Sequence, residues 1–192
     1  MKFWKVAVVG AVMAVAGTSV SAPQKPRLDA IWAAVHNRLT GQMDFWFEDG
    51  DYPRCIQMLR VLNEMDPSDY EAATDLGWML ENVESYDEAL AVYIKFRKDN
   101  PKSPDAAFPE ANFYYFRKAY SKVPLLIEPT LKSKPHGNSF RILAHSYERL
   151  GLLADSKRVW QNFIKLAPKD ETARANLRRV EGKIKSQNVK NT

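Results

Sequence analysis

The sequence predicts an all-α protein in which about four helical hairpins stack on one another. Prolines recur at intervals of 34, 34 and 33 residues, at Pro67, Pro101, Pro135 and Pro168. Small or compact residues recur near the middle of each expected second helix, and bulky residues follow one turn later. The compact set is Cys55, Ala89, Val123 and Ser156, and the bulky set is Leu59, Tyr93, Ile127 and Trp160. A repeat of about 34 residues is typical of stacked helix–turn–helix units.

These regularities have a physical reason in the packing of two helices. Antiparallel helices approach to about 8–10 Å between their axes, and the closest approach needs a small residue at the crossing. Each first helix carries a large residue, at Trp46, Leu80, Tyr114 and Tyr147, preceded by Met43, Gly77, Ala111 and Ala144. The prolines end the second helices, because proline lacks an N–H donor and disfavours helix in the residue before it. One hairpin cannot cover its own apolar faces, so neighbours must stack.

Residues 1–22 have the pattern of a secretory signal peptide. Lys2 and Lys5 precede an uncharged apolar run at 6–17, and small residues follow at 18–22. This order of charge, short apolar run and small residues is typical of a cleaved export signal. The run is shorter than the roughly 20 apolar residues of a transmembrane helix. Cleavage is expected after residue 21 or 22, and retention as a membrane anchor is the alternative.

The remaining elements are expected in order along the chain. Residues 23–35 form an N-terminal segment that leads into an entry helix from about 29 to 48. Hairpins occupy 36–170, and a final helix from about 171 to 185 caps the stack within a C-terminal region of 171–192. This arrangement amounts to nine helices. Residues suited to capping a helix N-terminus stand at Asp51, Ser68, Asp69 and Ser103.

The third hairpin departs from the others. Pro109 falls inside its expected first helix, and Pro124 and Pro129 fall inside its second. A proline in a helix interior costs about 3 kcal/mol. We therefore expect a helix from about 110 to 120 and then a short or broken segment to about 133. A helical hairpin of another type is the alternative here.

On these residues the chain resembles the tetratricopeptide repeat (TPR) family over roughly 36–170. The second unit carries the fullest match, at Leu76-Gly77, Leu80, Tyr86-Asp87-Glu88-Ala89-Leu90, Tyr93 and Asn100-Pro101. The first and last units match at Gly50-Asp51-Tyr52 with Asp66-Pro67, and at Leu143-Ala144, Tyr147, Gly151 and Ala167-Pro168. The resemblance implies a TPR-like helical-hairpin solenoid with a degenerate third unit and a C-terminal capping helix. Late in the second helices the family usually has a small residue, and this sequence has Leu62, Phe96, Thr130 and Phe163.

The resemblance also implies a binding face, because the first helices of TPR proteins line a concave groove that usually takes extended or helical peptides. Carried over by position, the groove residues are Asp44, Phe47, Thr74, Trp78, Glu81, Phe108, Asn112, Tyr115, Arg141 and His145. Some family members hold a peptide's terminal carboxylate with lysines, asparagines and an arginine. Only Asn112 matches that set, and Arg141 stands where a lysine would, so this kind of tail binding is not expected.

The expected groove combines aromatic rings with scattered charges, which is a composition that peptide-binding surfaces use. Aromatic residues of helical repeats nevertheless pack more often in the core than against a ligand. Trp46 and Trp160 are predicted as core residues. Trp78 is left open between groove and core.

Composition and motifs exclude several classes of function. The net charge of +5 falls to +3 once Lys2 and Lys5 are removed with the signal peptide, which makes no electrostatic case for nucleic acid. Cys55 is the only cysteine, so no internal disulfide is expected, and its position predicts a buried, inert thiol. The histidines lack the spacing of a zinc-protease motif, and no glycine-rich phosphate loop is present. We therefore predict no enzyme activity, cofactor or metal.

The expected C-terminal helix is rich in cations, with Arg174, Arg178, Arg179, Lys183 and Lys185. A basic helix of this kind can dock on anionic lipid. The alternative is a solvated face whose cations lie near the helix C-terminus, where the helix dipole favours them. The second interpretation is preferred, so membrane contact is not expected after signal cleavage.

The sequence as a whole predicts an exported protein of the bacterial periplasm or cell envelope. Its expected role is that of a protein-binding scaffold or adaptor, which captures a peptide or helix of a partner in the concave groove. The alternative is a self-associating structural module without a dedicated peptide site, and the formation of homo-oligomers is left open. The identity of the partner does not follow from the sequence.

Overall fold

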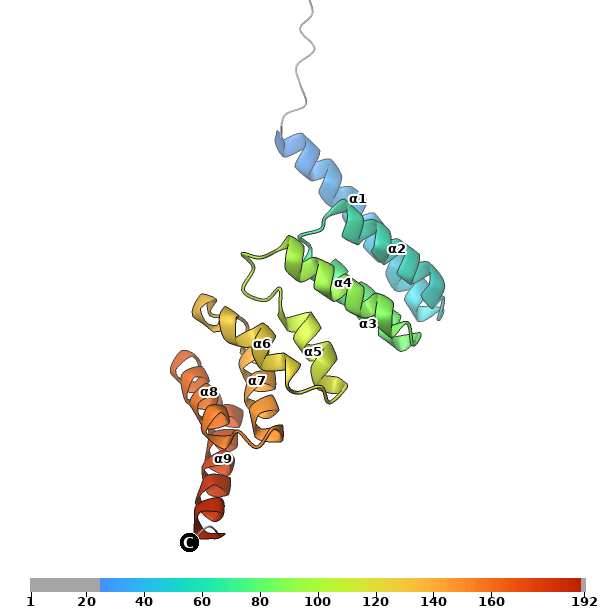
Figure 1. Cartoon of the computed structure of the whole chain (residues 1–192). Helices are drawn as coiled ribbons and strands as arrows, with labels where there is room; N and C mark the ends of the chain where they lie inside the picture. The colour runs from blue at the N-terminus through green and yellow to red at the C-terminus, as the bar shows by residue number, and fades with distance from the viewer. Residues whose placement is uncertain (1–24, 191–192) are drawn as a thin grey trace, which may run out of the picture. The chain divides into compact units, whose positions relative to one another are not determined.

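The computed structural model describes residues 25–190, so the expected signal peptide at 1–22 lies outside the described residues (Figure 1). The chain divides into two units, 1–40 and 41–192, and each is treated by itself. The described part of the first unit belongs to α1 (Lys25–Glu48), which begins slightly before its expected start and ends where expected. Within this part of α1, Leu28, Ile31, Trp32 and Val35 are all exposed.

The second unit consists of helices in the expected order. Their bounds are α2 (Tyr52–Met65), α3 (Tyr70–Asn82), α4 (Tyr86–Asp99), α5 (Phe108–Phe116), α6 (Lys122–Ile127), the 3₁₀-helix η1 (Glu128–Ser133), α7 (Gly137–Arg149), α8 (Leu153–Leu166) and α9 (Glu171–Lys190). Helix α3 packs beside α4, and α7 beside α8, as hairpins (Figure 1). The part of the chain that is described contains nine α-helices and no strand, which confirms the all-α prediction.

The turn between the two helices has the same geometry in all four hairpins. A residue with positive φ follows each first helix: Gly50, Glu84, Lys118 and Gly151, with φ of 75°, 61°, 61° and 77°. In each turn the next residue donates its backbone N–H to the carbonyl of the recurring large residue. These bonds run from Asp51 to Trp46, Ser85 to Leu80, Ala119 to Tyr114 and Leu152 to Tyr147, at 2.8–2.9 Å. Such left-handed closures satisfy carbonyls at a helix C-terminus.

The small residues occupy the helix crossings, as predicted. Cys55, Ala89, Val123 and Ser156 are fully buried. Gly77 of α3 shows how close the approach is, because a Cβ atom placed there would lie 2.1 Å from Cε1 of Tyr93 on α4. Only a residue without a side chain allows the Tyr93 ring to pass this point.

The third unit is broken, as expected, but one proline does not act as predicted. Helix α5 ends at Phe116, earlier than expected, and α6 has six residues before the chain tightens into η1. Pro109 was predicted inside a helix interior, and that placement is wrong. It lies in the first turn of α5, where its missing N–H would have had no helical partner. Pro124 and Pro129 lie in α6 and η1, where the second helix is interrupted.

Two of the four predicted caps are observed. Asp51 accepts a bond from the N–H of Arg54 at the start of α2, and Asp69 accepts bonds from two N–H groups at the start of α3. Ser68 instead donates its hydroxyl to Asp66. The N-cap position of α5 is Ala107 rather than Ser103, and no side chain caps this helix.

The core consists of two main clusters that meet at α5. One combines buried residues of α2, α3 and α4 with Phe113 of α5. The other runs from Ala111 of α5 through α7 and α8, where Trp160 is fully buried as predicted, and reaches Ala173 and Val180 of α9. The final helix therefore covers the end of the stack, and it continues to Lys190, beyond the expected end.

Candidate functional site

A polar and aromatic hollow lies at the C-terminal ends of the first helices α3 and α5. It encloses about 610 Å³. We call it the aromatic hollow, and its lining is Trp78, Glu81, Asn82, Tyr86, Asn112, Phe116 and Arg117. It brings together three of the predicted groove residues, Trp78, Glu81 and Asn112. Trp78 is 50% exposed and Phe116 is 71% exposed, so both rings are open to a partner.

The floor of the aromatic hollow is held by Arg117 and Glu81. The guanidinium of Arg117 donates to Glu81 at 2.9 Å and stacks over the rings of Tyr86 and Phe113, at 4.4 and 3.5 Å from their centroids. Glu81 also accepts the hydroxyl of the buried Tyr93 at 2.8 Å. Burial and the bond to Glu81 raise the pKa of Tyr93, so it stays a hydrogen-bond donor. These contacts fix the polar groups before any ligand arrives.

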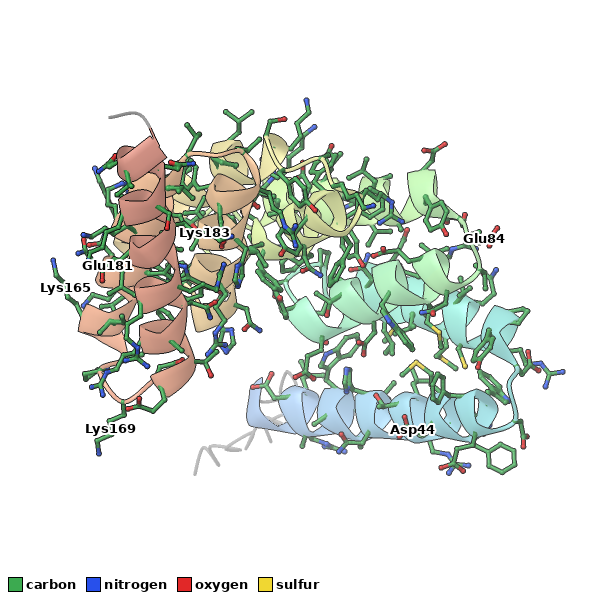
Figure 2. All side chains as sticks on the ribbon, turned by 90° about the horizontal axis from the view of Figure 1, so that it is seen from below. Asp44, Glu84, Lys165, Lys169, Glu181 and Lys183 are labelled. Carbon is green, nitrogen blue, oxygen red and sulfur yellow. The ribbon has the colours of Figure 1, made fainter. Side chains whose placement is uncertain are left out.

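Two further predicted residues lie at the end of α1 that belongs to the second unit. The ring of Phe47 is 42% exposed and lies 6.2 Å from the ring of Trp78, centroid to centroid. Asp44 is exposed on the same helix and is labelled in Figure 2. Phe47 therefore extends the row of accessible aromatic rings beyond the aromatic hollow itself.

The predicted residues Tyr115 and His145 lie in a second hollow, of about 590 Å³, between α5, α7 and α9. We call it the cationic cleft. Its other lining residues are Glu148, Arg149, Asn176, Arg179 and Lys183. Burial lowers the pKa of His145, so the imidazole is neutral at pH 7.

Glu148 is the acidic member of the cationic cleft. Burial opposes its charge, but hydrogen bonds from Arg179 and Lys183 outweigh this and lower its pKa to about 2. Arg179 binds both carboxylate oxygens, one of them at 2.7 Å, and the ammonium of Lys183 donates at 2.6 Å. Glu148 is therefore ionised throughout the neutral pH range, and it orients both cations.

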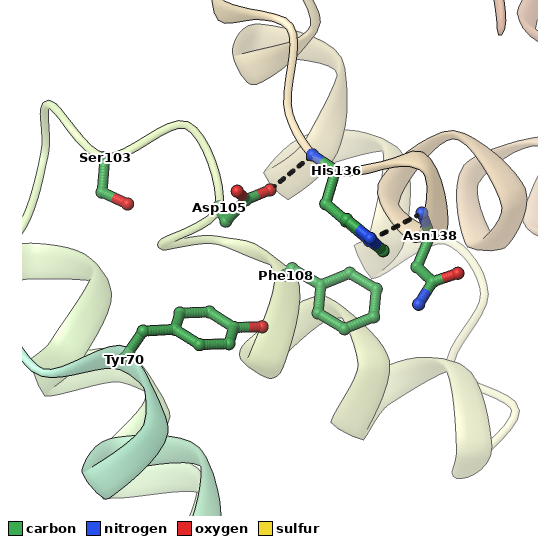
Figure 3. A pocket seen from close by; sticks show the side chains of 6 residues that line it. All are labelled: Tyr70, Ser103, Asp105, Phe108, His136 and Asn138. Atoms are coloured by element: carbon green, nitrogen blue, oxygen red, sulfur yellow. Dashed lines mark hydrogen bonds between the residues drawn. The ribbon is translucent and has the colours of Figure 1, made fainter. Parts of the chain in front are cut away.

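The predicted residue Phe108 lines a third pocket, of about 420 Å³, which Figure 3 shows. Ser103, Asp105 and His136 share this pocket, but their bonds do not fit a catalytic triad. Asp105 accepts the backbone N–H of His136 at 2.7 Å, and the ring nitrogen Nδ1 of His136 accepts the N–H of Asn138 (Figure 3). A triad needs the carboxylate on the imidazole instead.

Two predicted groove residues are engaged within the fold. Arg141 donates to Asn138 at 2.8 Å and to Asp170 at 2.6 Å, which ties α7 to the start of α9. Thr74 donates its hydroxyl to backbone carbonyls of its own helix α3. A role in ligand binding stays a prediction for both.

Other candidate chemistry is limited in the described residues. Cys55 is buried, and burial raises the pKa of its thiol, which opposes the thiolate form that a nucleophile needs. Between residues 25 and 190, no group of three or more His, Cys, Asp or Glu side chains is placed to hold a metal ion. Within the same range, no helix is long and apolar enough to cross a membrane.

Comparisons with known proteins agree with this architecture. No family model matches the sequence, and a comparison with curated protein sequences finds no match. A tetratricopeptide repeat protein from Parabacteroides merdae superposes with a TM-score of 0.61 at 17% identity, over 77% of this chain and 60% of its own. MamA from Desulfovibrio magneticus RS-1 superposes with a TM-score of 0.55 at 17% identity, over 79% of this chain and 96% of its own. MamA of strain AMB-1 superposes with a TM-score of 0.54 at 15% identity, over 77% of this chain and 87% of its own.

The chain has a TPR-like fold. Register along the first helices of this TPR-like solenoid pointed to Trp78, Glu81 and Asn112 of the aromatic hollow. It missed residues that the ends of these helices and the neighbouring helices contribute. The missed residues are Asn82, Tyr86, Phe116, Arg117, Arg149 and Asn176. A signal for some of them was present, because Phe116-Arg117 places an aromatic next to a cation at the end of a first helix.

Proposed function

We propose that this protein is a binding module which captures a peptide or helical segment of a partner protein over the aromatic hollow. The observation that carries the proposal is the pair of exposed rings, Trp78 and Phe116, above polar groups that are already fixed. Exposed aromatic side chains in a concave site are typical anchors of protein interfaces. The TPR-like fold supports the proposal, because stacked hairpins form extended binding surfaces. The proposed activity is binding rather than catalysis.

We further propose that the protein is exported and acts in the bacterial periplasm or cell envelope as a scaffold or adaptor. The support for this is the order of charge, apolar run and small residues in 1–22. A fusion of residues 1–22 to a reporter that is active only outside the cytoplasm should be exported. Retention of that reporter in the cytoplasm would contradict the assignment.

The capture proposal is tested by removing the two exposed rings of the hollow and, as a control, an exposed apolar side chain elsewhere. Protein with Trp78→Ala and Phe116→Ala, immobilised and exposed to an envelope fraction, should lose the partner that the wild type retains. Leu125→Ala is the control, because Leu125 is 72% exposed on α6 and does not line the hollow. The affinity of the captured partner should fall at least tenfold (about 1.4 kcal/mol) for the double variant. Equal retention by all three proteins would refute the proposal.

Self-association is a second candidate, and one observation favours it. Leu28, Ile31, Trp32 and Val35 share one face of α1, at positions i, i+3, i+4 and i+7, and are 51%, 54%, 44% and 39% exposed. An exposed apolar stripe on a helix is typical of an interaction surface. Sedimentation at increasing protein concentration should then show association that Ile31→Lys abolishes. A monomer at all concentrations would refute this candidate.

A further inference from the structure

The cationic cleft carries more positive charge than its own carboxylate balances. Three cations, Arg149, Arg179 and Lys183, line the cleft with the single carboxylate of Glu148, so two positive charges remain in excess. Arg149, the last residue of α7, is exposed and has no carboxylate partner among the described residues. The side chains of Arg179 and Lys183 are 41% and 52% exposed, although both bind Glu148.

Two of these cations, Arg179 and Lys183, are also held in place by hydrogen bonds. Arg179 donates to both oxygens of Glu148 and to the side-chain oxygen of Asn176, the latter at 3.0 Å. An ammonium has three donors, and the bond from Lys183 to Glu148 uses one of them. Figure 2 shows Lys183 and Glu181 on different sides of α9, and Glu181 forms its ion pair with Lys157 of α8 instead. The unused donors of the cleft are therefore free to take an anion.

Consecutive residues of α5 line the cationic cleft and the aromatic hollow. Tyr115 lines the cleft and Phe116 lines the hollow, and their rings contact edge-on with centroids 5.8 Å apart. A partner segment that crosses this stretch of α5 is therefore placed to contact both hollows.

We propose that the cationic cleft binds the carboxylate groups of an acidic stretch in the partner segment, next to the apolar side chain that the aromatic hollow takes. This inference rests on the proposed capture function and adds the chemistry of its ligand. Arginine suits the role because its planar fork matches a carboxylate in two parallel hydrogen bonds. Complementary charge of this kind sets both the orientation of a ligand and its rate of association.

An anionic membrane is the competing ligand class, and the structure favours a peptide. A helix that lies on a bilayer inserts an apolar face. In α9 this face is covered, because Ala173 and Val180 are fully buried, and Leu177 and Ile184 pack against the same core. A recessed cleft between three helices also suits a peptide chain better than a flat surface.

The test uses a fluorescein-labelled oligoglutamate peptide and measures its binding by fluorescence anisotropy at low salt. Arg149→Ala should weaken binding about tenfold, as expected for the loss of a charge-assisted hydrogen bond. Arg178→Ala removes the same charge from α9 at a residue that does not line the cleft, and it should change binding less than twofold. An oligolysine peptide should not bind. Equal effects of the two substitutions would show attraction by net charge alone and would overturn the proposal.

Two further arms separate the alternatives. If Arg149→Ala weakens the binding of phosphatidylglycerol vesicles but leaves oligoglutamate binding unchanged, the cleft belongs to phosphate headgroups and the proposal is overturned. Trp78→Ala should leave oligoglutamate binding unchanged, because this probe has no apolar side chain. Partner capture that requires Trp78 but not Arg149 would keep the proposed function and overturn this inference. Oligoglutamate binding through Arg149, with partner capture indifferent to Trp78, would support the cleft and refute the capture site.

Discussion

Gly77→Ala should destabilise the protein although alanine is the better helix former. A Cβ at position 77 would lie 2.1, 2.3 and 2.6 Å from Cε1, Cζ and the hydroxyl of Tyr93. The ring must move by more than 1 Å, because ordinary van der Waals contact begins at 3.4 Å. Overpacking of this kind typically costs about 1–3 kcal/mol. Tyr93 is 5% exposed, and its hydroxyl is bonded to Glu81, so a cost near the top of that range is expected.

The helix propensity of alanine offsets part of this cost, by about 1 kcal/mol. If Tyr93 rotates away, the bond to Glu81 is lost as well, at about 1.5–3 kcal/mol. The net loss should be about 2–3 kcal/mol, which lowers Tm by roughly 5–10 °C for a chain of this size. Thermal unfolding followed by circular dichroism at 222 nm measures the shift.

The matched control is Gly182→Ala in α9. A Cβ there meets no described atom within 4 Å, so the gain in helix propensity should appear alone and stabilise by up to about 1 kcal/mol. The two identical substitutions should thus have opposite signs. Adding Tyr93→Leu to Gly77→Ala should give less than the sum of the single effects, since the clash partner is gone. A Gly77→Ala protein as stable as the control would refute the close-approach argument.

Three further predictions concern a buried carboxylate, a strained turn and an unpaired hydroxyl. The pKa of Glu148 is lowered from 4.5 to about 2, so the stability that it contributes is complete above about pH 4.5 and is lost as the pH falls toward 2. Glu148→Gln should lower the free energy of unfolding at pH 7 by about 1–2 kcal/mol, after allowance for the exposed partners. The same substitution should flatten the acid-unfolding profile between these pH values. Lys118→Gly should stabilise by about 0.5–1 kcal/mol in urea unfolding, because φ is 61° there. Ser156→Ala should stabilise by about 1 kcal/mol, measured in the same way, because its buried hydroxyl has no described partner.

Each of these predictions has a result that would contradict it. An acid-unfolding profile unchanged by Glu148→Gln would mean that the carboxylate is not held by its cations. Gly50→Ala, in the equivalent turn, should lose about 1 kcal/mol, and a gain there would contradict the argument for Lys118. A loss of stability in Ser156→Ala would show that the hydroxyl is bonded after all.

The helix ends were predictable because they depend on local sterics. Proline cannot continue a helix beyond its first turn, so α2, α4 and α8 end just before Pro67, Pro101 and Pro168. Pro109 was misjudged because its effect depends on where the helix begins, and the loop before α5 is longer than the repeat suggests. The left-handed turn that the four hairpins share could not be predicted from the sequence. Glu84 and Lys118 occupy its positive-φ position in two hairpins, and the other two have glycine there.

The candidate site was less predictable because it depends on contacts between distant residues. Trp78 and Glu81 followed from register along a first helix. The position of Arg117 over the Tyr86 and Phe113 rings depends on the turn after α5, which periodicity does not describe. The ion pair of Arg141 with Asp170, 29 residues away, likewise required the packing of α7 against the start of α9. The polar partners of a helical repeat come from neighbouring units, and the sequence does not reveal that pairing.

The meeting of two core clusters at α5 affects how the chain unfolds. The stability of a repeat protein is the sum of the stabilities of its units and of their nearest-neighbour interfaces. A weak interface at α5 therefore permits one block, α2–α4 or α6–α9, to unfold before the other. Between the blocks lie Phe113 and two ion pairs, Arg97 with Glu110 at 2.6 Å and Arg117 with Glu81. Hydrogen exchange should therefore show two levels of protection, one on each side of α5. A ligand in the aromatic hollow touches both blocks, and its binding would join them into one cooperative unit.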